Sequence, residues 1–296
     1  TENDEYYELI DDSCITFEQI QLYCLSFIRG LINSFSKNNI VFTEEFINSI
    51  FPDVVQTICP FVLKNEIVQK SAMKTILAIC KYFHNKSPHI ILPFYHYFIS
   101  IFETNWEISN IFFKNIFDLN IQLDLPSDFL GSLLTLSFKQ FIQNNFDILP
   151  MLASVANRYE GFPIVEFHQI VQANFETMKP EEVGNVISVY YKYILNNFLT
   201  EDKLPLINDI MKLSFKALEL CATFSIPPNP IRLFSILSQN SIKFNDQTIS
   251  QFYPIFIDIF NTESQSEFYQ STIYESILFL IRIIVLFPEI HFPFDS

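Results

Sequence analysis

Apolar residues recur along this chain at every third or fourth position in segment after segment, which is the spacing of amphipathic helices. Val68, Ala72, Ile76, Ile79 and Phe83 form one such stripe, because side chains at these intervals lie on the same face of a helix. The gaps between segments are short, so neighbouring helices are expected to pack antiparallel. The pattern predicts thirteen helices, at 15–36, 43–62, 65–84, 88–103, 105–121, 127–143, 146–159, 163–178, 180–199, 203–224, 229–243, 248–261 and 265–287.

Polar residues and prolines mark several of the predicted helix starts. Proline followed by two acids at 180–182 suits a first turn, where no backbone donor is needed and the helix dipole favours negative charge. Four capping boxes, with a Ser or Thr three residues before a Glu or Gln, are Thr16 with Gln19, Thr104 with Glu107, Thr248 with Gln251 and Ser264 with Glu267. Four helices are predicted to carry a proline in their first turns, namely Pro52, Pro93, Pro205 and Pro254.

A similar apolar stripe returns about every 40 residues along the chain. Two helices in a unit of this length is the period of HEAT and armadillo repeats. The alternative is chance, because any apolar helical protein offers stripes that can be aligned. The stripes begin at Ile28, Val68, Ile108, Ile148, Ile187, Leu233 and Ile273, at intervals of 40, 40, 40, 39, 46 and 40 residues. Those after Val68 continue through Phe112, Ile116 and Leu119; Leu152, Ala156 and Tyr159; Tyr191, Leu195 and Phe198; Leu237 and Phe244; and Ile277, Leu280 and Ile284.

The segment from Ile50 to Ile76 carries the most specific form of this repeat. It has a first helix containing Pro52, a turn at Asn65-Glu66, and a second helix of the type V-Q-x-x-A that includes Val68 and Ala72. About 27 residues of this segment resemble a HEAT unit, and the looser repeats elsewhere resemble those of the importin-β (karyopherin) superfamily. The resemblance implies an all-α fold, a right-handed α-α superhelix of about six helical pairs plus one leading helix. It further implies recognition of basic protein cargo, the small GTPase Ran and nucleoporins, in the cytoplasm, the nucleus or both.

No Gly- or Ser-rich linker divides the chain, so we expect one solenoid over 15–296. The helix at 15–36 has the character of a second helix whose partner precedes Thr1. The solenoid is therefore expected to be a fragment of a longer array, with apolar surface exposed at its ends. The acidic segment 1–14 is either a solvated tail or a loop that contacts a basic partner.

Composition excludes several classes of protein. The four glycines are far apart, which excludes glycine-rich phosphate-binding loops and leaves too few turn residues for an all-β fold. The net charge of −15 disfavours direct binding of nucleic acid and favours basic protein partners. A membrane span is not expected. The longest uncharged stretch, between Lys86 and Glu103, contains Pro88 and Pro93, and the apolar run 277–287 contains Arg282. Five cysteines without a C-x-x-C pair indicate buried thiols in a reducing compartment.

Catalytic signals are weak in this sequence. Ser71 and Lys74 match the S-x-x-K signature of serine acyl enzymes, but its companion elements are absent. His84, His89 and His96 cluster without a metal-ligand spacing. The chain is therefore predicted not to be an enzyme and to need no metal or cofactor, although a helical enzyme with an unrecognised site stays a third hypothesis.

Second helices of such units typically line the concave face of a solenoid, so their polar residues are candidates for partner binding. Four asparagines recur at intervals of 42, 39 and 44 residues, resembling the ladder with which armadillo proteins hold a peptide backbone. In an Asn-rich chain, chance alignment is the competing explanation. A HEAT-type scaffold or adaptor, such as a phosphatase scaffolding subunit, is the alternative function. The candidate residues are Glu107, Asn110, Asn115, Asp118, Asn157, Glu181, Glu182, Asn196 and Asn240.

Overall fold

The computed structural model describes residues 16–40, 42–83, 91–118, 127–159, 161–197, 203–239 and 246–286, apart from the side chains of residues 46, 48, 118, 127 and 246–250. Thirteen α-helices and three short 3-10 helices form the regular structure of these residues, which contain no strand. The chain is therefore all-α, as the apolar periodicity predicts. Cys14, His84, His89 and the acidic segment 1–14 lie outside the described residues.

The chain divides into two compact units, Thr1–Asp124 and Leu125–Ser296, and each is described by itself. The expectation of one solenoid over 15–296 stays a prediction. The first unit contains α1 (Phe17–Lys37), α2 (Glu44–Ile58), η2 (Cys59–Leu63), α3 (Glu66–Phe83), α4 (Leu92–Ser100) and α5 (Trp106–Asp118). The second contains α6 (Ser127–Ile142), η4 (Phe146–Ile148), α7 (Leu149–Ala156), α8 (Ile164–Asn174), η5 (Phe175–Thr177), α9 (Pro180–Asn196), α10 (Leu204–Ala222), α11 (Asn229–Gln239), α12 (Asp246–Asn261) and α13 (Tyr269–Leu286).

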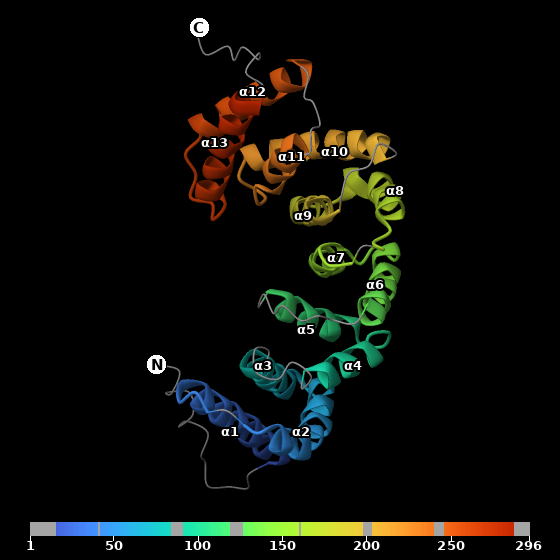
Figure 1. Cartoon of the computed structure of the whole chain (residues 1–296), viewed down its shortest axis with the longest axis vertical. Coiled ribbons are helices and arrows are strands. Elements are labelled where there is room, and N and C mark those ends of the chain that lie inside the picture. Colours follow the sequence, from blue (N-terminus) through green and yellow to red (C-terminus); the bar gives the residue numbers. More distant parts are fainter. Residues whose placement is uncertain are drawn as a thin grey trace. The chain divides into compact units, whose positions relative to one another are not determined.

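Alternate helices stack on one another within each unit (Figure 1). In the first unit α1 packs on α3, α3 packs on α5, and α2 packs on α4. In the second unit α7, α9, α11 and α13 form a continuous stack, while α10 packs on α12. The remaining helices lie beside these stacks; for example, α6 packs on α7. Each amphipathic helix thus buries its apolar face against neighbouring helices, because it could not bury that face alone.

Side chains also join residues that are about 40 positions apart in sequence. Arg232 Nε lies 2.8 Å from Glu275 Oε1, 43 residues further on, and links α11 to α13. Ser266 Oγ donates to the carbonyl oxygen of Phe224, 42 residues earlier, at 2.8 Å. Three further bonds of this kind join Tyr82 to Ile40, Lys216 to Glu176 and Asn196 to Asn157, at separations of 42, 40 and 39 residues. The interval found in the apolar stripes therefore also appears in contacts between polar groups.

The predicted helix starts are correct at some helices and wrong at others. Thr16 caps α1, with its Oγ1 accepting from the backbone N–H of Gln19, and α9 begins at Pro180 as predicted. Thr104 is not a cap, because its Oγ1 donates back to the carbonyl of Ile101 and α5 begins only at Trp106. Ser264 is not a cap either, since α13 begins at Tyr269. Thr248 lies inside α12, which begins at Asp246.

Two of the four prolines lie deeper in their helices than predicted. Pro93 and Pro205 occupy the first turns of α4 and α10, where a missing backbone donor costs nothing. Pro52 and Pro254 lie in the interiors of α2 and α12. The prediction was wrong at these two positions because α2 begins at Glu44 and α12 at Asp246, about two turns before each proline.

The apolar stripes predict the buried face well in α3 and poorly in α9 and α13. All five residues of the Val68 stripe are buried. In α9, Leu195 is exposed and the buried face runs through Tyr190 and Ile194 instead. In α13, Ile277 and Ile284 are exposed, whereas the buried seam contains the residues one position earlier. That seam consists of Thr272, Ser276, Phe279 and Ile283.

Three of the cysteines behave as buried hydrophobic residues, as predicted. Cys59, Cys80 and Cys221 are buried and free. Burial raises the pKa of the Cys59 thiol to about 12, and it raises the pKa of the other two as well, because the interior disfavours a thiolate. Cys24 is free but exposed, so the prediction was wrong for this residue.

Candidate functional site

The polar row predicted on the second helices is only partly available to a partner. On α5, Glu107 and Asn115 are exposed and Asn110 is buried. Asn115 Nδ2 donates to the carbonyl of Ile111 at 2.7 Å, so the side-chain amide is hydrogen-bonded to its own helix. The side chain of Asp118 and all of Asn240 lie outside the described residues.

In the second unit the structure brings two of the predicted asparagines together. Asn196 of α9 donates through Nδ2 to both the backbone carbonyl and the side-chain oxygen of Asn157, which follows α7. Two members of the row in the second unit therefore bond to each other across the α7–α9 seam. An amide used in this way stabilises the stack and is not presented as an open donor to a peptide backbone.

The two predicted acids of α9 occupy its first turn. Glu182 Oε2 accepts from the backbone N–H of Lys179 at 2.7 Å, which satisfies one of the donors that a helix start leaves without a partner. Glu181 is exposed beside it, where the helix dipole favours a negative charge. Stabilisation of the helix start explains both acids without a binding role.

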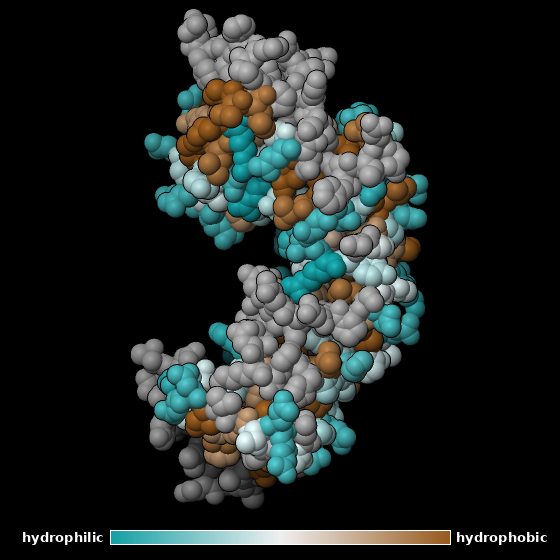
Figure 2. Space-filling model, viewed as in Figure 1, coloured by the Kyte–Doolittle hydropathy of each residue, from teal (hydrophilic) through white to brown (hydrophobic). Residues whose placement is uncertain are grey.

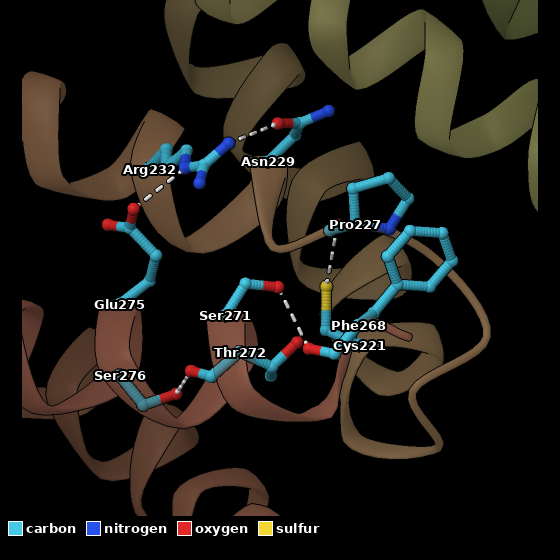
Figure 3. Close-up of polar contacts among 9 residues, drawn as sticks. All are labelled: Cys221, Pro227, Asn229, Arg232, Phe268, Ser271, Thr272, Glu275 and Ser276. Atoms are coloured by element: carbon cyan, nitrogen blue, oxygen red, sulfur yellow. Dashed lines mark hydrogen bonds and ion pairs between the residues drawn. The ribbon is translucent and has the colours of Figure 1, made fainter. Parts of the chain in front are cut away.

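Polar contacts at the end of the second stack tie α11 to α13, and α10 to the loop before α11 (Figure 3). Arg232 lies between two oxygens, bonding Glu275 through Nε at 2.8 Å and approaching Asn229 Oδ1 from Nη1 at 3.5 Å. Both side chains of the ion pair are partly buried. Nearby, Cys221 Sγ lies 3.5 Å from the carbonyl of Pro227. These contacts join neighbouring elements of one unit, which stabilises the end of the stack.

The catalytic and metal-binding signals gain no support from the described residues. Lys74 is exposed on α3, and Ser71 contributes its backbone carbonyl to a hydrogen bond from Thr75. Of the clustered histidines only His96 is described, and it is exposed on α4. The described residues contain no group of three or more side chains suited to hold a metal ion. The prediction that the chain is not an enzyme stays a prediction.

One titratable pair escaped the sequence analysis. His168 of α8 is buried, and its Nδ1 lies 2.8 Å from the hydroxyl of Tyr190 in α9. Burial lowers the pKa of the imidazole, although the charge of Asp209 opposes the shift, and burial raises the pKa of the tyrosine well above its usual value. The signal in the sequence is the position of His168 between Phe167 and Val171 on an apolar face. A polar residue on such a face is expected to need a partner.

Among the described residues, each unit has a hollow that could hold a ligand. In the first unit a cavity of about 240 Å³ lies among α1, α2 and α3 and is lined only by apolar side chains such as Ile28, Phe42 and Phe51. In the second unit a groove of about 670 Å³ runs along α6, facing Tyr159 and Pro163. The sequence analysis predicted neither, because no motif marks them.

Exposed apolar surface is concentrated on α1 and α13. The stripe on α13 includes Ile277, Ile281 and Ile284, and hydrophobic surface is visible over the α12–α13 end of the second unit in Figure 2. Within the described residues, α13 is also the one helix long and apolar enough to cross a membrane, by length and composition only. One such helix is weak evidence, so the absence of a membrane span stays a prediction.

No protein-family model, curated protein or solved structure matches this chain. The resemblance to HEAT repeats and to the importin-β superfamily therefore stays a hypothesis drawn from the residues. Any function has to be argued from the helical stacks, their surface and their charge.

Proposed function

We propose that this chain is a protein-binding helical-repeat scaffold, a right-handed α-α superhelix of the HEAT and armadillo kind. The most specific form of the proposal is that it belongs to a nuclear transport receptor that binds basic protein cargo and Ran, in the cytoplasm, the nucleus or both. Nucleoporins are further partners that the resemblance implies.

The observation that carries the proposal is the agreement between two independent intervals. Apolar stripes recur every 39 to 46 residues in the sequence, and side-chain hydrogen bonds join five pairs of residues 39 to 43 positions apart, with a sixth pair, Thr75 and Leu25, 50 positions apart. Contacts separated by about one unit length are expected when each two-helix unit packs on the next. Solenoids of this kind offer long surfaces to other proteins.

Charge supports a basic protein as the partner. The chain carries 33 acidic residues and 18 basic ones, and its net charge of −15 produces a negative field. Such a field attracts cationic proteins and repels nucleic acid phosphates. Binding of a basic partner is therefore expected to weaken as salt concentration rises, because surface charges are screened within about 10 Å at 0.1 M salt.

A structural scaffold or adaptor is the second candidate, and one observation favours it. Asn157 and Asn196 bond to each other and Asn115 bonds to its own helix. The row of amides that would hold an extended peptide is therefore occupied internally at the positions described. A scaffold that positions folded partners needs no such row.

Deletion of one unit tests the repeat architecture. Removing residues 164–203, which hold α8, η5 and α9, leaves an alternating order of helices in which α7 can pack on α11. A repeat protein is expected to keep its helicity and a cooperative unfolding transition after this deletion. Removing residues 180–197, which hold α9 alone, is the control that breaks the alternation. Equal unfolding of both variants by circular dichroism would contradict the repeat architecture.

Binding of Ran separates the two candidate functions. Immobilised chain is incubated with Ran loaded with a non-hydrolysable GTP analogue and, as the control, with GDP-loaded Ran. The transport hypothesis expects capture of the GTP form alone, with affinity that falls as salt rises. If neither form is captured, the transport hypothesis fails and the scaffold remains, provided that the deletion experiment supports the repeat.

A further inference from the structure

The cavity of the first unit lies among α1, α2 and α3. Its volume is about 240 Å³, and all of its described lining residues belong to this unit. Protein interiors are closely packed and contain few voids larger than a water molecule. A hollow of this size is therefore larger than the packing defects of an ordinary core.

Every described lining residue of the cavity is apolar. The lining consists of isoleucine, leucine, valine and phenylalanine side chains, and none of them offers a charge, a hydrogen-bond donor or an acceptor to a ligand. A polar group that enters such a site loses its hydrogen bonds to water and gains none in return, which costs free energy. The enclosed part of a ligand is therefore expected to carry no charge and no hydrogen-bonding group.

The cavity has a buried floor and an open mouth. Ile47 of α2 and Ile79 of α3, which are 4% and 1% exposed, form the floor. Leu31 of α1 and Ile50 of α2 also line the cavity, but they are 38% and 44% exposed and therefore lie at its mouth. A ligand can thus reach the floor from solvent between α1 and α2.

Four phenylalanine rings form a connected wall of the cavity. The ring centroid of Phe42 lies 4.9 Å from that of Phe35, with the planes at 83°, and 6.3 Å from that of Phe83. The Phe83 centroid lies 5.1 Å from that of Phe51, with the planes at 77°. Aromatic rings attract one another in edge-to-face and offset geometries, at centroid distances of about 4.5–7 Å, beyond the gain from buried area. An aromatic ligand can extend this arrangement, whereas a saturated ring or an alkyl chain gains only apolar contact.

The volume of the cavity favours a ligand with a single ring. An engineered apolar cavity of about 150 Å³ in another protein binds benzene, and sites for drug-sized ligands usually measure about 300–1,000 Å³. The present cavity, at about 240 Å³, lies between these two sizes. It is therefore large enough for one aromatic ring with small carbon substituents.

We infer that the cavity among α1, α2 and α3 binds a small uncharged aromatic molecule with a single ring, of the alkylbenzene class. The cavity is distinct from the polar row of the second helices and depends on no charged side chain. The inference therefore stands whether or not the chain binds Ran or a basic partner.

The test compares toluene with methylcyclohexane by isothermal titration calorimetry on the full chain. The two compounds have the same carbon skeleton, but methylcyclohexane is the less soluble in water, so a merely apolar surface would bind it more tightly. The phenylalanine wall is expected to reverse this order and to favour toluene by roughly threefold or more. Toluene should also raise the temperature of thermal unfolding, because it binds the folded chain.

Substitution of one lining valine locates the bound toluene. Val54→Phe places a further ring in the cavity and is expected to weaken toluene binding about tenfold or more and to abolish the thermal shift. Val165→Phe is the matched control, because it makes the same change at a position of α8 that is 51% exposed and lies in the other unit. Its affinity for toluene is expected to stay within about twofold of the parent chain.

Circular dichroism checks the folding of each variant. If Val54→Phe fails to fold, Leu31→Glu replaces it by placing a charge at the mouth, with Phe27→Glu at a more exposed position of α1 as its control. The inference is overturned if toluene shows no saturable binding, if the cavity variant binds it like the parent chain, or if methylcyclohexane binds more tightly. It is also overturned if N-acetylphenylalanine methylamide binds more tightly than toluene, which would identify a pocket for an aromatic side chain of a partner protein.

Discussion

The helices α3 and α13 both belong to the helical stacks of their units but bury different kinds of side chain. α3 packs on α1 and α13 packs on α11. Ile76 of α3 lies at the centre of a buried stripe of mostly apolar residues, whereas the seam of α13 includes two residues with hydroxyl groups, Thr272 and Ser276. Two stacked helices are thus held by different kinds of side chain.

A pair of fully buried threonines makes the difference measurable. In α3, Thr75 Oγ1 lies 2.9 Å from the carbonyl of Ser71 in its own helix and 3.2 Å from the carbonyl of Leu25 in α1. In α13, Thr272 Oγ1 has no hydrogen-bond partner among the described residues, and its carbonyl accepts from Ser276 (Figure 3). A buried hydroxyl stabilises a seam when the neighbouring helix offers an acceptor, and it costs free energy when nothing does.

The two helices also differ in how far they are covered. α3 lies between α1 and α5 in its stack and also packs on η2, whereas α13 is the last described helix of its stack and packs on α11 and α12. The uncovered side of α13 exposes Ile277, Ile281 and Ile284. Coverage on two sides explains why hydropathy alone identified the buried face of α3 and failed for α13.

The largest difference in unfolding free energy between the two helices is expected when one isoleucine in each is replaced by alanine. Ile76 has no exposed surface, so Ile76→Ala removes buried methyl groups and leaves a cavity, at a cost of about 2–5 kcal/mol in the free energy of unfolding. Ile281 is 53% exposed, and Ile281→Ala is expected to cost less than about 0.5 kcal/mol. Urea denaturation followed by circular dichroism measures both. Equal costs would mean that the outer face of α13 is covered in solution.

Replacement of each buried threonine by valine is expected to change stability in opposite directions. Thr75→Val removes the hydroxyl that bonds α3 and leaves the Leu25 carbonyl without this donor, and we expect a loss of about 1–2 kcal/mol. Thr272→Val removes an unsatisfied hydroxyl at constant shape and is expected to be neutral or to stabilise by up to about 1 kcal/mol. Loss of stability in the second variant would show that a bound water satisfies Thr272.

A third polar seam, between α8 and α9, is expected to make stability depend on pH. Burial lowers the pKa of His168 in the folded chain below its ordinary value of 6.5. The unfolded chain then binds the proton first, so stability falls as pH drops below about 6.5 and levels off below the folded pKa. His168→Gln removes this titration, and its stability should change less across the same window. Parallel pH profiles of thermal unfolding for the two chains would contradict the assignment.

Local signals in the sequence predicted the helices well because each depends on its own residues. The thirteen segments, the cap at Thr16 and the start at Pro180 follow from periodicity and from groups close in sequence. The buried seam of α13 could not be predicted in this way, because hydroxyls such as that of Ser276 can bond a carbonyl of their own helix and then pack against a neighbour.

The candidate sites were harder to predict than the helices. The pairing of Asn157 with Asn196 depends on how α9 packs on α7. The groove along α6 depends on where the connection between α7 and α8 lies beside that helix, which no motif records. Both are set by relations between elements rather than by the residues of one element.

The smallest effect on folding, and the clearest on association, is expected from a charge on the open side of α13. Ile281→Lys places a cation in the exposed stripe and should leave the unfolding transition almost unchanged, because this side chain is already 53% exposed. Contiguous exposed apolar surface promotes association, so the parent chain is expected to self-associate and the variant to do so less. Analytical ultracentrifugation over a range of concentrations measures the difference. Gln270→Lys is the matched control, because it adds the same charge at an exposed polar position of α13 and keeps the stripe intact. If both substitutions reduced association equally, net charge and not the apolar stripe would control association. The exposed stripe of α13 would then not act as an association surface in solution, in contradiction to the contrast with the covered α3.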